Sequence, residues 1–452
     1  MLYRCLTNFY FFALMRRFFV SLLARCARFY IARTKPYIIW VTWSVGKTTC
    51  RLIITQLLRQ QLPTLHIDTS EKNFNSEIWL CLAILWIRSY EPTFFSTLRT
   101  LFFAVARWLF ASSRADVFVL EYWIDHPWDM DELLAITTPH MWILTGIDTV
   151  HAVYFPTPQD IFTEKVKLLN AASDIVFYAS SLHTYFEHHE LAWDVLSFAL
   201  HEDENDTDIG FNAYAYRRVD ETVWSEFIVC EGEDRMVKIR TNLVGHEHAW
   251  YLSLAYEIAQ IIAVRKNLYF PVEQSIDVSV DLQPWRMHRF AWKWWSILLD
   301  SSYNASPWSM RMMIRLLTDM RQQLFPERKL VFCLGEMREL WNESKSAHEW
   351  LVNHVLHADR LFLIWQDIYD YLLPELFASW YATDRVTWFS DAISLWKALD
   401  IYLSEQQELS LVLFKWSQNT IFLEEAVKQV LRFPEDVKKL CRQDARRLQK
   451  KE

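Results

Sequence analysis

The sequence predicts an α/β protein, with a P-loop central domain built on a mostly parallel sheet and a Rossmann-like C-terminal α/β domain. Three observations predict this class. Apolar strands alternate with helical segments from residue 38 onward, which is typical of a parallel sheet covered by helices. A Gly-Lys-Thr-Thr segment follows the first apolar run, and a second series of strands and helices begins near Gln283.

The central region contains four predicted strands that are separated by helices. The strands are residues 38–42, 117–121, 141–145 and 174–178, and the helices are residues 48–60, 130–136 and 158–170. The C-terminal region repeats the pattern with strands at residues 296–300, 330–334, 360–364 and 411–415. We therefore divide the chain into an N-terminal segment 1–37, a central domain 38–282 and a C-terminal domain 283–452.

Composition limits the functional classes. A chain of 452 residues is long enough for two or three domains. A formal net charge of −8 argues against a general nucleic-acid binder. The seven cysteines include no C-x-x-C pair, which suits a reducing cytosol and favours neither a disulfide framework nor a zinc site. We expect a cytoplasmic monomer.

The balance of glycine and tryptophan is unusual. The chain has 6 Gly and 23 Trp, whereas ordinary usage of roughly 7% Gly predicts about 32 glycines in a chain of this length. We infer that most tryptophan codes stand for glycine, and the simplest cause is a UGA codon that the source organism reads as glycine. The alternative is a protein that is truly rich in tryptophan and poor in glycine.

The N-terminal segment is basic and aromatic, and its first 38 residues contain no acidic residue. Its apolar runs, 9–15 and 18–24, are interrupted by Arg16 and Arg17 and are too short to span a bilayer. Two interpretations remain open: an amphipathic helix on the inner face of an anionic membrane, or a helix packed against the body of the protein. Residues 78–113 form a second apolar helical stretch, either an extension of that surface or core helices.

The segment from Gly46 to Thr49 has the features of a phosphate-binding loop that opens a helix. Backbone N–H groups of Gly46 and its neighbours would hold phosphate oxygens, Lys47 would neutralise the β- and γ-phosphates, and the Thr48 hydroxyl would bind Mg²⁺. Trp43 stands at the first glycine position of this loop, where a side chain fills the space that phosphate needs.

Three further residues are candidates for the same site. Glu121 ends an apolar strand, at the edge of the sheet where ligands bind in open α/β folds, so it is a candidate Mg²⁺ ligand or a solvent-exposed carboxylate. His151 follows the next strand, and Lys165 lies fourteen residues beyond it. Taken alone, His151 and Lys165 are as compatible with structural roles as with functional ones.

The order of these motifs resembles the Mur ligases of peptidoglycan synthesis, most of all the members that add D-alanyl-D-alanine. Further segments match the family pattern: Asn-Phe-Asn-Ser-Glu-Ile-Trp at 73–79, Pro-Trp-Arg-Met at 284–287, Asp-Ser-Ser-Tyr-Asn-Ala-Ser-Pro at 300–307, Leu-Gly-Glu-Met-Arg-Glu-Leu-Trp at 334–341 and Lys-Trp-Ser at 415–417. The match covers about residues 38–430. Tryptophan stands at family glycine positions 40, 43, 79, 123, 128, 285, 341 and 416.

The resemblance implies an ATP- and Mg²⁺-dependent ligase that activates a peptide carboxylate as an acyl phosphate, which an amine then attacks. It implies metal ligation by Thr48, Glu121 and His151, and a carbamylated lysine at Lys165. It implies that the nucleotide is covered from the C-terminal domain by Arg286, Asp300 and Asn304. Lys415 and Ser417 would lie on the acceptor side.

The chain departs from the family pattern in several places. Only a short basic segment precedes the phosphate loop, where the family has a domain that binds the UDP-sugar. The segment from Gly245 to Tyr251 lacks both family asparagines, which puts the adenine contacts in doubt. Lys167 replaces a family glutamate, and Ser301 replaces the second aspartate of a D-D pair.

We therefore expect a cell-wall ligase that joins D-alanyl-D-alanine, or another amine, to a UDP-sugar-peptide precursor. One alternative is a related ligase of the folylpolyglutamate synthase type with another acceptor. The other is a membrane-associated nucleotide-binding protein without ligase activity.

Overall fold

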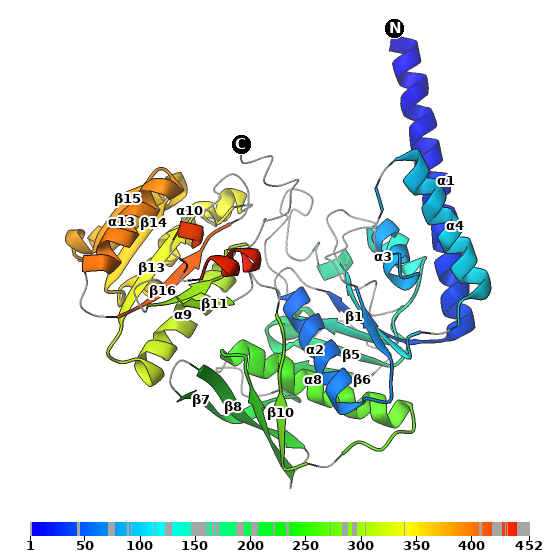
Figure 1. Ribbon diagram of the computed structural model, residues 1–452, viewed down its shortest axis with the longest axis horizontal. Coiled ribbons are helices and arrows are strands. Elements are labelled where there is room, and N and C mark those ends of the chain that lie inside the picture. The colour runs from blue at the N-terminus through cyan, green and yellow to red at the C-terminus, as the bar shows by residue number, and fades with distance from the viewer. Residues whose placement is uncertain are drawn as a thin grey trace.

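The computed structural model describes residues 2–440 apart from a set of internal gaps. It describes side chains from residue 16 onward, except for those of residues 129, 185, 231, 235, 288–291, 341, 434, 438 and 439. The gaps are residues 43–45, 71–76, 88–89, 92, 113, 123–128, 146–159, 161, 165–166, 168–170, 187–193, 200–206, 220–221, 232–234, 272, 283–287, 292–295, 303, 339, 406–408, 418–426, 430 and 432. The described residues form three sheets and the helices that cover them (Figure 1).

The first sheet is parallel throughout and has the strand order β2-β3-β1-β4-β5-β6. Its strands are β1 (Tyr37–Thr42), β2 (Ile67–Thr69), β3 (Val117–Tyr122), β4 (Met141–Leu144), β5 (Ile175–Ala179) and β6 (Asp194–Phe198). The chain adds strands on one side of β1 and then crosses to the other side at β4. This switch point places the carboxyl end of β1 where open α/β sheets bind ligands.

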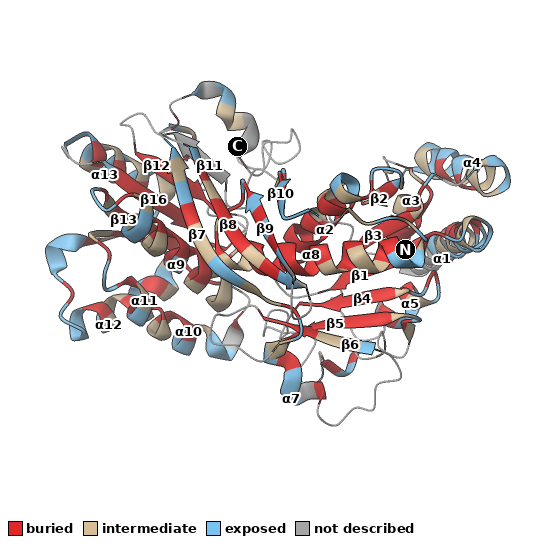
Figure 2. Cartoon of the chain, turned by 90° about the horizontal axis from the view of Figure 1, so that it is seen from below, coloured by how far each residue is buried: buried red, intermediate tan, exposed pale blue. Residues whose placement is uncertain are grey.

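Helices cover both faces of this sheet, so every residue of β1 is buried (Figure 2). Side chains alternate along the strand: Ile39 and Val41 face the core under α2 (Lys47–Gln61) and α8 (His246–Arg265). Ile38 and Trp40 face the opposite core. The predicted strands of this sheet are confirmed to within one residue at each end.

The opposite face is covered by the N-terminal helix α1 (Leu2–Thr34) together with α3 (Glu77–Ile84) and α5 (Asp129–Leu134). One stripe of α1 packs into that core: Phe19, Leu23, Cys26, Ala27 and Tyr30. Helix α4 (Phe94–Phe110) lies beside α1 (Figure 1). No helix within the described part of the chain is long and apolar enough to cross a membrane.

A four-stranded sheet that the sequence analysis did not predict follows β6. Its order is β10-β9-β8-β7, formed by β7 (Phe211–Val219), β8 (Thr222–Glu231), β9 (Arg235–Thr241) and β10 (Ser275–Val278). Tyr216 and Val223 of this sheet pack against α9 (Pro307–Leu324). The Arg218 guanidinium donates to the carbonyl of Leu324 at 2.8 Å. The sheet therefore joins the first α/β unit to the second.

The third sheet has the order β11-β12-β16-β13-β14-β15 and is parallel except for β11. Its strands are β11 (His288–Ala291), β12 (Ile297–Asp300), β13 (Lys329–Gly335), β14 (Arg360–Ile364), β15 (Val386–Phe389) and β16 (Ser410–Lys415). The four predicted strands are confirmed. Its α-helices include α9, α10 (Ser344–Trp350), α11 (Val352–Val355), α12 (Leu373–Ala378) and α13 (Ala392–Glu405).

An aspartate at the amino end of β5 connects the first sheet to α8. Tyr37 Oη donates to Asp174 Oδ2 at 2.7 Å, and Arg265 donates to the two carboxylate oxygens at 2.8 Å and 2.5 Å. The hydrogen bonds from Arg265, and next from Tyr37, hold the pKa of Asp174 below its ordinary value, against the opposing effect of partial burial.

We predict that Asp174→Asn lowers the free energy of unfolding by about 2 kcal/mol at pH 7, the usual size for a hydrogen bond to a charged group. Because the pKa is lowered in the folded state, this contribution is present above the ordinary aspartate pKa of about 3.9 and disappears as the pH falls through the folded value. Urea unfolding from pH 7 to pH 2 measures it. Asp277→Asn, at a side chain 76% exposed, is the control and should change little. A loss that stays constant over this pH range would contradict the argument.

Candidate functional site

The phosphate-loop segment described by the structure begins at Gly46, which caps the N-terminus of α2. Gly46 has φ 84° and ψ −13°, a left-handed conformation that favours glycine. Lys47, Thr48 and Thr49 form the buried first turn of the helix. The helix thus directs the N–H groups of its first turn toward the carboxyl end of the sheet, which is an anion-binding arrangement.

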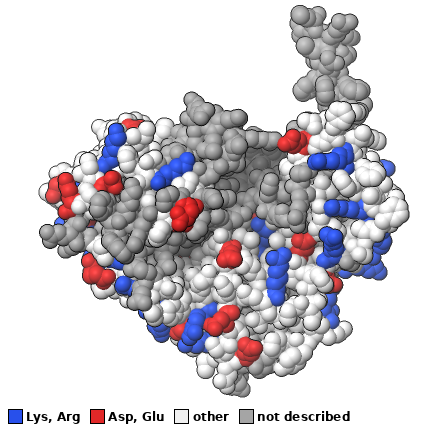
Figure 3. All heavy atoms as spheres, viewed as in Figure 1, with Lys and Arg blue, Asp and Glu red and all other residues white. Residues whose placement is uncertain are grey.

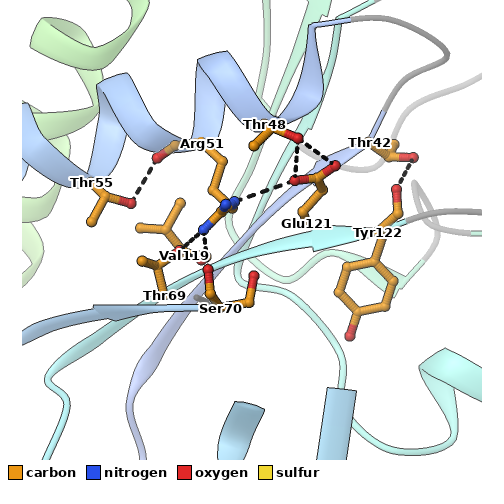
Figure 4. Close-up of polar contacts among 9 residues, drawn as sticks. All are labelled: Thr42, Thr48, Arg51, Thr55, Thr69, Ser70, Val119, Glu121 and Tyr122. Carbon is orange, nitrogen blue, oxygen red and sulfur yellow. Dashed lines mark hydrogen bonds and ion pairs between the residues drawn. The ribbon is translucent and has the colours of Figure 1, made fainter. Parts of the chain in front are cut away.

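Thr48 and Glu121 meet at this edge (Figure 4). Thr48 Oγ1 lies 3.0 Å from Glu121 Oε1 and 2.9 Å from Oε2, so the hydroxyl donates to the carboxylate. Glu121 is the partner of Val41 in the register of β3 against β1, and its side chain is 5% exposed. The strand pairing therefore brings the carboxylate to the first turn of α2, as the sequence analysis required of a shared site.

Arg51 is a member of this site that the sequence analysis missed. Its Nε lies 3.3 Å from Glu121 Oε2, and its Nη1 donates to Thr69 Oγ1 at 2.6 Å and to the Ser70 carbonyl at 2.5 Å (Figure 4). The side chain is 1% exposed. The available signal was its position three residues after Thr48, on the same helical face. Arg51 fixes the carboxylate and connects α2 to the end of β2.

Two threonines continue the same edge. The hydroxyl of Thr42 donates to the Tyr122 carbonyl at 3.3 Å, and that of Thr145 donates to the Thr42 carbonyl at 3.4 Å. Both threonines are fully buried. Side-chain hydrogen bonds therefore link the carboxyl ends of β3, β1 and β4, next to the N-terminus of α2.

Several predicted site residues lie outside the described residues: Trp43 in the loop, His151, Lys165 and Arg286. Their roles stay predictions. Lys167, which replaces a family glutamate, lies within the described residues. Its Nζ is 2.7 Å from Asp131 Oδ2 and 3.0 Å from Glu164 Oε2. It belongs to a peripheral ion-pair network.

A second cluster lies at the carboxyl edge of the third sheet. The Lys415 ammonium, 3% exposed, donates to the carbonyl of Ser301 at 3.3 Å and to the carbonyl of Asn304. Ser417 Oγ donates to the Ala305 carbonyl at 3.1 Å and accepts from the backbone N–H of Arg338 at 2.9 Å. These two side chains shape the loop after β12.

The other predicted residues of that loop have local partners. Asp300 is fully buried, and its Oδ1 accepts from the Ser302 N–H at 3.0 Å. Asn304 is partly exposed, and its Oδ1 accepts from the Ala305 N–H at 3.0 Å. Asn304 is therefore better placed than Asp300 to reach a nucleotide.

The segment at the start of α8 is built into the core. Tyr251 is 2% exposed and His248 is 3% exposed. The Nδ1 of His248 lies 2.7 Å from the Val244 carbonyl, and burial lowers the pKa of this histidine to about 4. His248 is therefore neutral and buried, and Tyr251 lies in the core that α8 shares with α2. These two residues of the segment that lacks the family asparagines are thus part of the interior.

The chemistry of this site fits a magnesium nucleotide. A threonine hydroxyl and a carboxylate are the hard oxygen ligands that Mg²⁺ prefers, alongside water and phosphate oxygens. No group of three or more His, Cys, Asp or Glu side chains comes together within the described residues. The described part of the site therefore offers two protein ligands, Thr48 and Glu121, beside an anion-binding helix terminus.

Comparison with models of protein families gives one match, in the central region of the chain. Residues 41–255 match the model of the Mur ligase middle domain. No curated protein sequence matches the chain. The residues that form the described site, from Thr42 to Thr145, all lie inside the matched segment.

Solved structures of two kinds resemble the chain. The MurF ligase of Thermotoga maritima in complex with ADP is 19% identical with a TM-score of 0.65, covering 93% of this chain and 84% of its own. A MurF structure from Acinetobacter baumannii is 16% identical with a TM-score of 0.67, covering 90% and 79%. An FPGS–AMPPCP complex is 14% identical with a TM-score of 0.54, covering 91% and 94%. The fold is the one that these ligases share.

We predict that Arg51→Met lowers the free energy of unfolding by about 3 kcal/mol, because it removes the counter-charge that lies against the buried Glu121 carboxylate. Urea unfolding at neutral pH measures the loss. Arg59→Met, further along the same helix, removes an exposed guanidinium that donates to the Ile67 carbonyl and should cost about 1 kcal/mol. Equal losses in the two variants would show that the Arg51–Glu121 pair has no special role.

Proposed function

We propose that this chain, which carries a Mur ligase middle domain at residues 41–255, is an ATP-dependent acid–amino-acid ligase of peptidoglycan precursor synthesis. The observation that carries the proposal is the convergence of Thr48 and Glu121 at the N-terminus of α2, at the switch point of the sheet. A carboxylate of the acceptor attacks the γ-phosphorus of ATP, forming an acyl phosphate and releasing ADP. The amine then attacks the acyl carbon, forming the amide and releasing phosphate and a proton.

The residues contribute electrostatics and position. The N-terminus of α2 and Lys47 would hold the phosphates of ATP. The acceptor carboxylate could then approach the γ-phosphate although both groups are negatively charged. Thr48 and Glu121 would hold Mg²⁺, which neutralises the charge that develops on the transferred phosphoryl group. Arg51 keeps the Glu121 carboxylate oriented. We propose His151 as a further metal ligand, Arg286 and Asn304 as nucleotide contacts, and Lys415 and Ser417 as supports of the acceptor side.

We propose D-alanyl-D-alanine as the amine and a UDP-sugar-peptide as the acceptor. The support is the set of sequence motifs, together with higher TM-scores against the MurF structures, 0.65 and 0.67, than against FPGS, 0.54. A polyglutamate-adding activity on another acceptor is the second candidate. The share of each solved structure that aligns with this chain favours it. The alignment covers 94% of the FPGS chain, but only 84% and 79% of the two MurF chains.

We also propose that the natural protein carries glycine at most of the positions written as tryptophan. The phosphate loop needs this most, because an indole at position 43 competes with phosphate for the space inside the loop. Backbone conformation supports the proposal independently. Six non-glycine residues among those described have positive φ, and three of them are tryptophans: Trp86, Trp365 and Trp380, with φ of 50°, 81° and 61°.

Two of these tryptophans occupy the position after a helix where glycine is usual. After α12, the Trp380 N–H donates to the Phe377 carbonyl at 3.1 Å and the Tyr381 N–H to the Leu376 carbonyl at 3.0 Å. After α3, the N–H groups of Trp86 and Ile87 make the same pair of bonds, at 3.2 Å and 2.9 Å. This is the Schellman motif, whose left-handed residue is usually glycine. A bulky side chain at such a residue is an outlier.

Close backbone approach supports glycine at position 416, and a buried indole without a hydrogen-bond partner supports it at positions 40 and 416. A Cβ placed on Gly335 would lie 2.6 Å from the Cβ of Trp416, so the ends of β13 and β16 leave little room for side chains. Trp40 is fully buried, with its ring centroid 3.5 Å from that of Tyr122. Within the described residues, the indole nitrogens of Trp40 and Trp416 have no hydrogen-bond partner, which is costly for a buried N–H.

We predict that the free energy of unfolding is about 1 kcal/mol higher for Trp380→Gly than for Trp380→Ala. The reason is that alanine keeps a Cβ, which disfavours a left-handed backbone conformation. The indole is 94% exposed, so neither variant loses core packing. Urea unfolding compares the two. Equal stability of the variants would count against a glycine-requiring backbone at this position.

The ligase activity and the role of Lys165 have a common test in the chain carrying glycine at the tryptophan positions. With ATP and Mg²⁺, we expect ADP and phosphate release that requires both D-alanyl-D-alanine and a UDP-sugar-tripeptide. Lys165→Arg should lower the rate by at least about a hundredfold, since arginine keeps its charge and cannot carry a carbamate. Lys165→Ala should recover part of its activity with added short carboxylates.

Lys167→Arg is the matched control, because Lys167 is already paired with Asp131 and Glu164, and it should keep near-normal activity. Full activity in Lys165→Arg would refute the carbamate. If the release of ADP and phosphate instead requires glutamate and a folate-type acceptor, the second candidate function is established.

A further inference from the structure

The paired helices α1 and α4 form a surface that the ligase reaction does not use. We propose that this α1–α4 surface, defined by the exposed faces of the two helices, docks the protein onto an anionic lipid surface. The proposal is independent of the ligase function and concerns where the enzyme is held.

Helix α4 has its apolar face turned outward. Its buried positions are the small residues Thr100 and Ala104, which is the reverse of the usual pattern for a surface helix of a globular protein. The exposed apolar side chains, with exposed fractions from 43% to 84%, are Phe94, Phe95, Leu98, Phe102, Phe103, Leu109 and Phe110. Such a row of aromatic side chains is typical of a helix that lies in the interface of a bilayer.

Helix α1 extends the same surface. One of its faces packs into the core, and its other face exposes Phe18 by 62% and Phe29 by 55%. Phe29 stacks on Trp108 of α4 with ring centroids 5.3 Å apart, so the two helices lie against each other. Among the described residues that precede Val219, every exposed large apolar side chain belongs to α1 or α4. In this part of the chain, the exposed apolar surface therefore lies on these two helices, whereas the exposed apolar residues from Val219 onward are spread over several other elements.

The charges on these helices are all of one sign. Arg16, Arg17, Arg25, Arg28 and Arg33 lie on the described part of α1, Arg99 and Arg107 lie on α4, and neither helix sequence contains Asp or Glu. Figure 3 shows Lys and Arg side chains gathered on the side of the molecule that these helices form. Arg16 pairs with Glu77, and Arg28, Arg33 and Arg107 donate to backbone carbonyls. Exposed arginines beside exposed phenylalanines, above all Arg17 and Arg25, match anionic headgroups above a hydrocarbon layer.

The same charges disfavour a second copy of the chain as the occupant. Two such surfaces brought face to face would bury arginines against arginines, without a carboxylate from either helix to compensate them. The exposed apolar set on α1 and α4 contains no tryptophan. The exposed apolar side chains themselves are therefore the same whichever residue occupies the tryptophan positions, although Trp108 contributes to the contact between the two helices.

Co-sedimentation of the full chain with vesicles tests the proposal, using phosphatidylcholine alone and phosphatidylcholine with phosphatidylglycerol. We expect binding to the anionic vesicles to be at least about tenfold tighter. Replacing Phe94, Phe95, Phe102 and Phe110 by serine should weaken that binding by at least about tenfold. Arg17→Gln with Arg25→Gln should weaken binding to anionic vesicles only.

The matched control replaces three exposed apolar residues of the C-terminal region, Phe377, Ile393 and Ile401, by serine, and should bind as the unchanged chain does. Near-UV circular dichroism checks that each variant is folded. Equal binding by the phenylalanine variant and the control, or no preference for anionic vesicles, would overturn the proposal. A dimer in sedimentation velocity that only the phenylalanine variant abolishes, without vesicle binding, would assign the surface to a second copy.

Discussion

The hydrogen bond between Thr48 and Glu121 is the contact on which the site depends, because it joins the phosphate-loop helix to the neighbouring strand. The parallel pairing of β1 and β3 sets the register that places Val41 opposite Glu121. Arg51 then holds the carboxylate from the buried side. If Thr48 and Glu121 hold the magnesium of a nucleotide, as proposed, this arrangement would keep both oxygen ligands in place before the nucleotide binds.

Much of the architecture follows from local sequence patterns. The eight inner strands of the two α/β sheets were predicted to within about a residue, because burial on both faces demands continuous apolar runs. The edge strands β2, β6, β11 and β15 were not predicted. The sheet of β7 to β10 was not predicted. Its strand β10 alternates strictly between exposed and buried residues but is only four residues long. β7 mixes exposed and buried positions without a strict period of two. That sheet matters, since it connects the first α/β unit to α9.

The candidate site was partly predictable. Thr48 and Glu121 carry a motif and a strand-end position, and the structure brings them together. Arg51 carries no motif, and its role depends on a tertiary contact with β2 and β3 that a single sequence does not reveal. Lys415 was predicted from a motif, but the structure shows its ammonium bound to loop carbonyls, a role decided by the approach of β16 to β12.

Glycine is the constraint that links the fold to the function. The helix ends at Trp86 and Trp380 adopt a left-handed backbone that favours glycine, although tryptophan has the largest side chain. We also expect glycine at position 43, because the proposed phosphate binding leaves no room for an indole there. Mass spectrometry of the protein isolated from its source organism tests this most directly, through the tryptic peptide 34–47, which contains positions 40 and 43 and ends at Lys47. We predict a peptide with glycine at both positions. A peptide with tryptophan at position 43 would contradict the account.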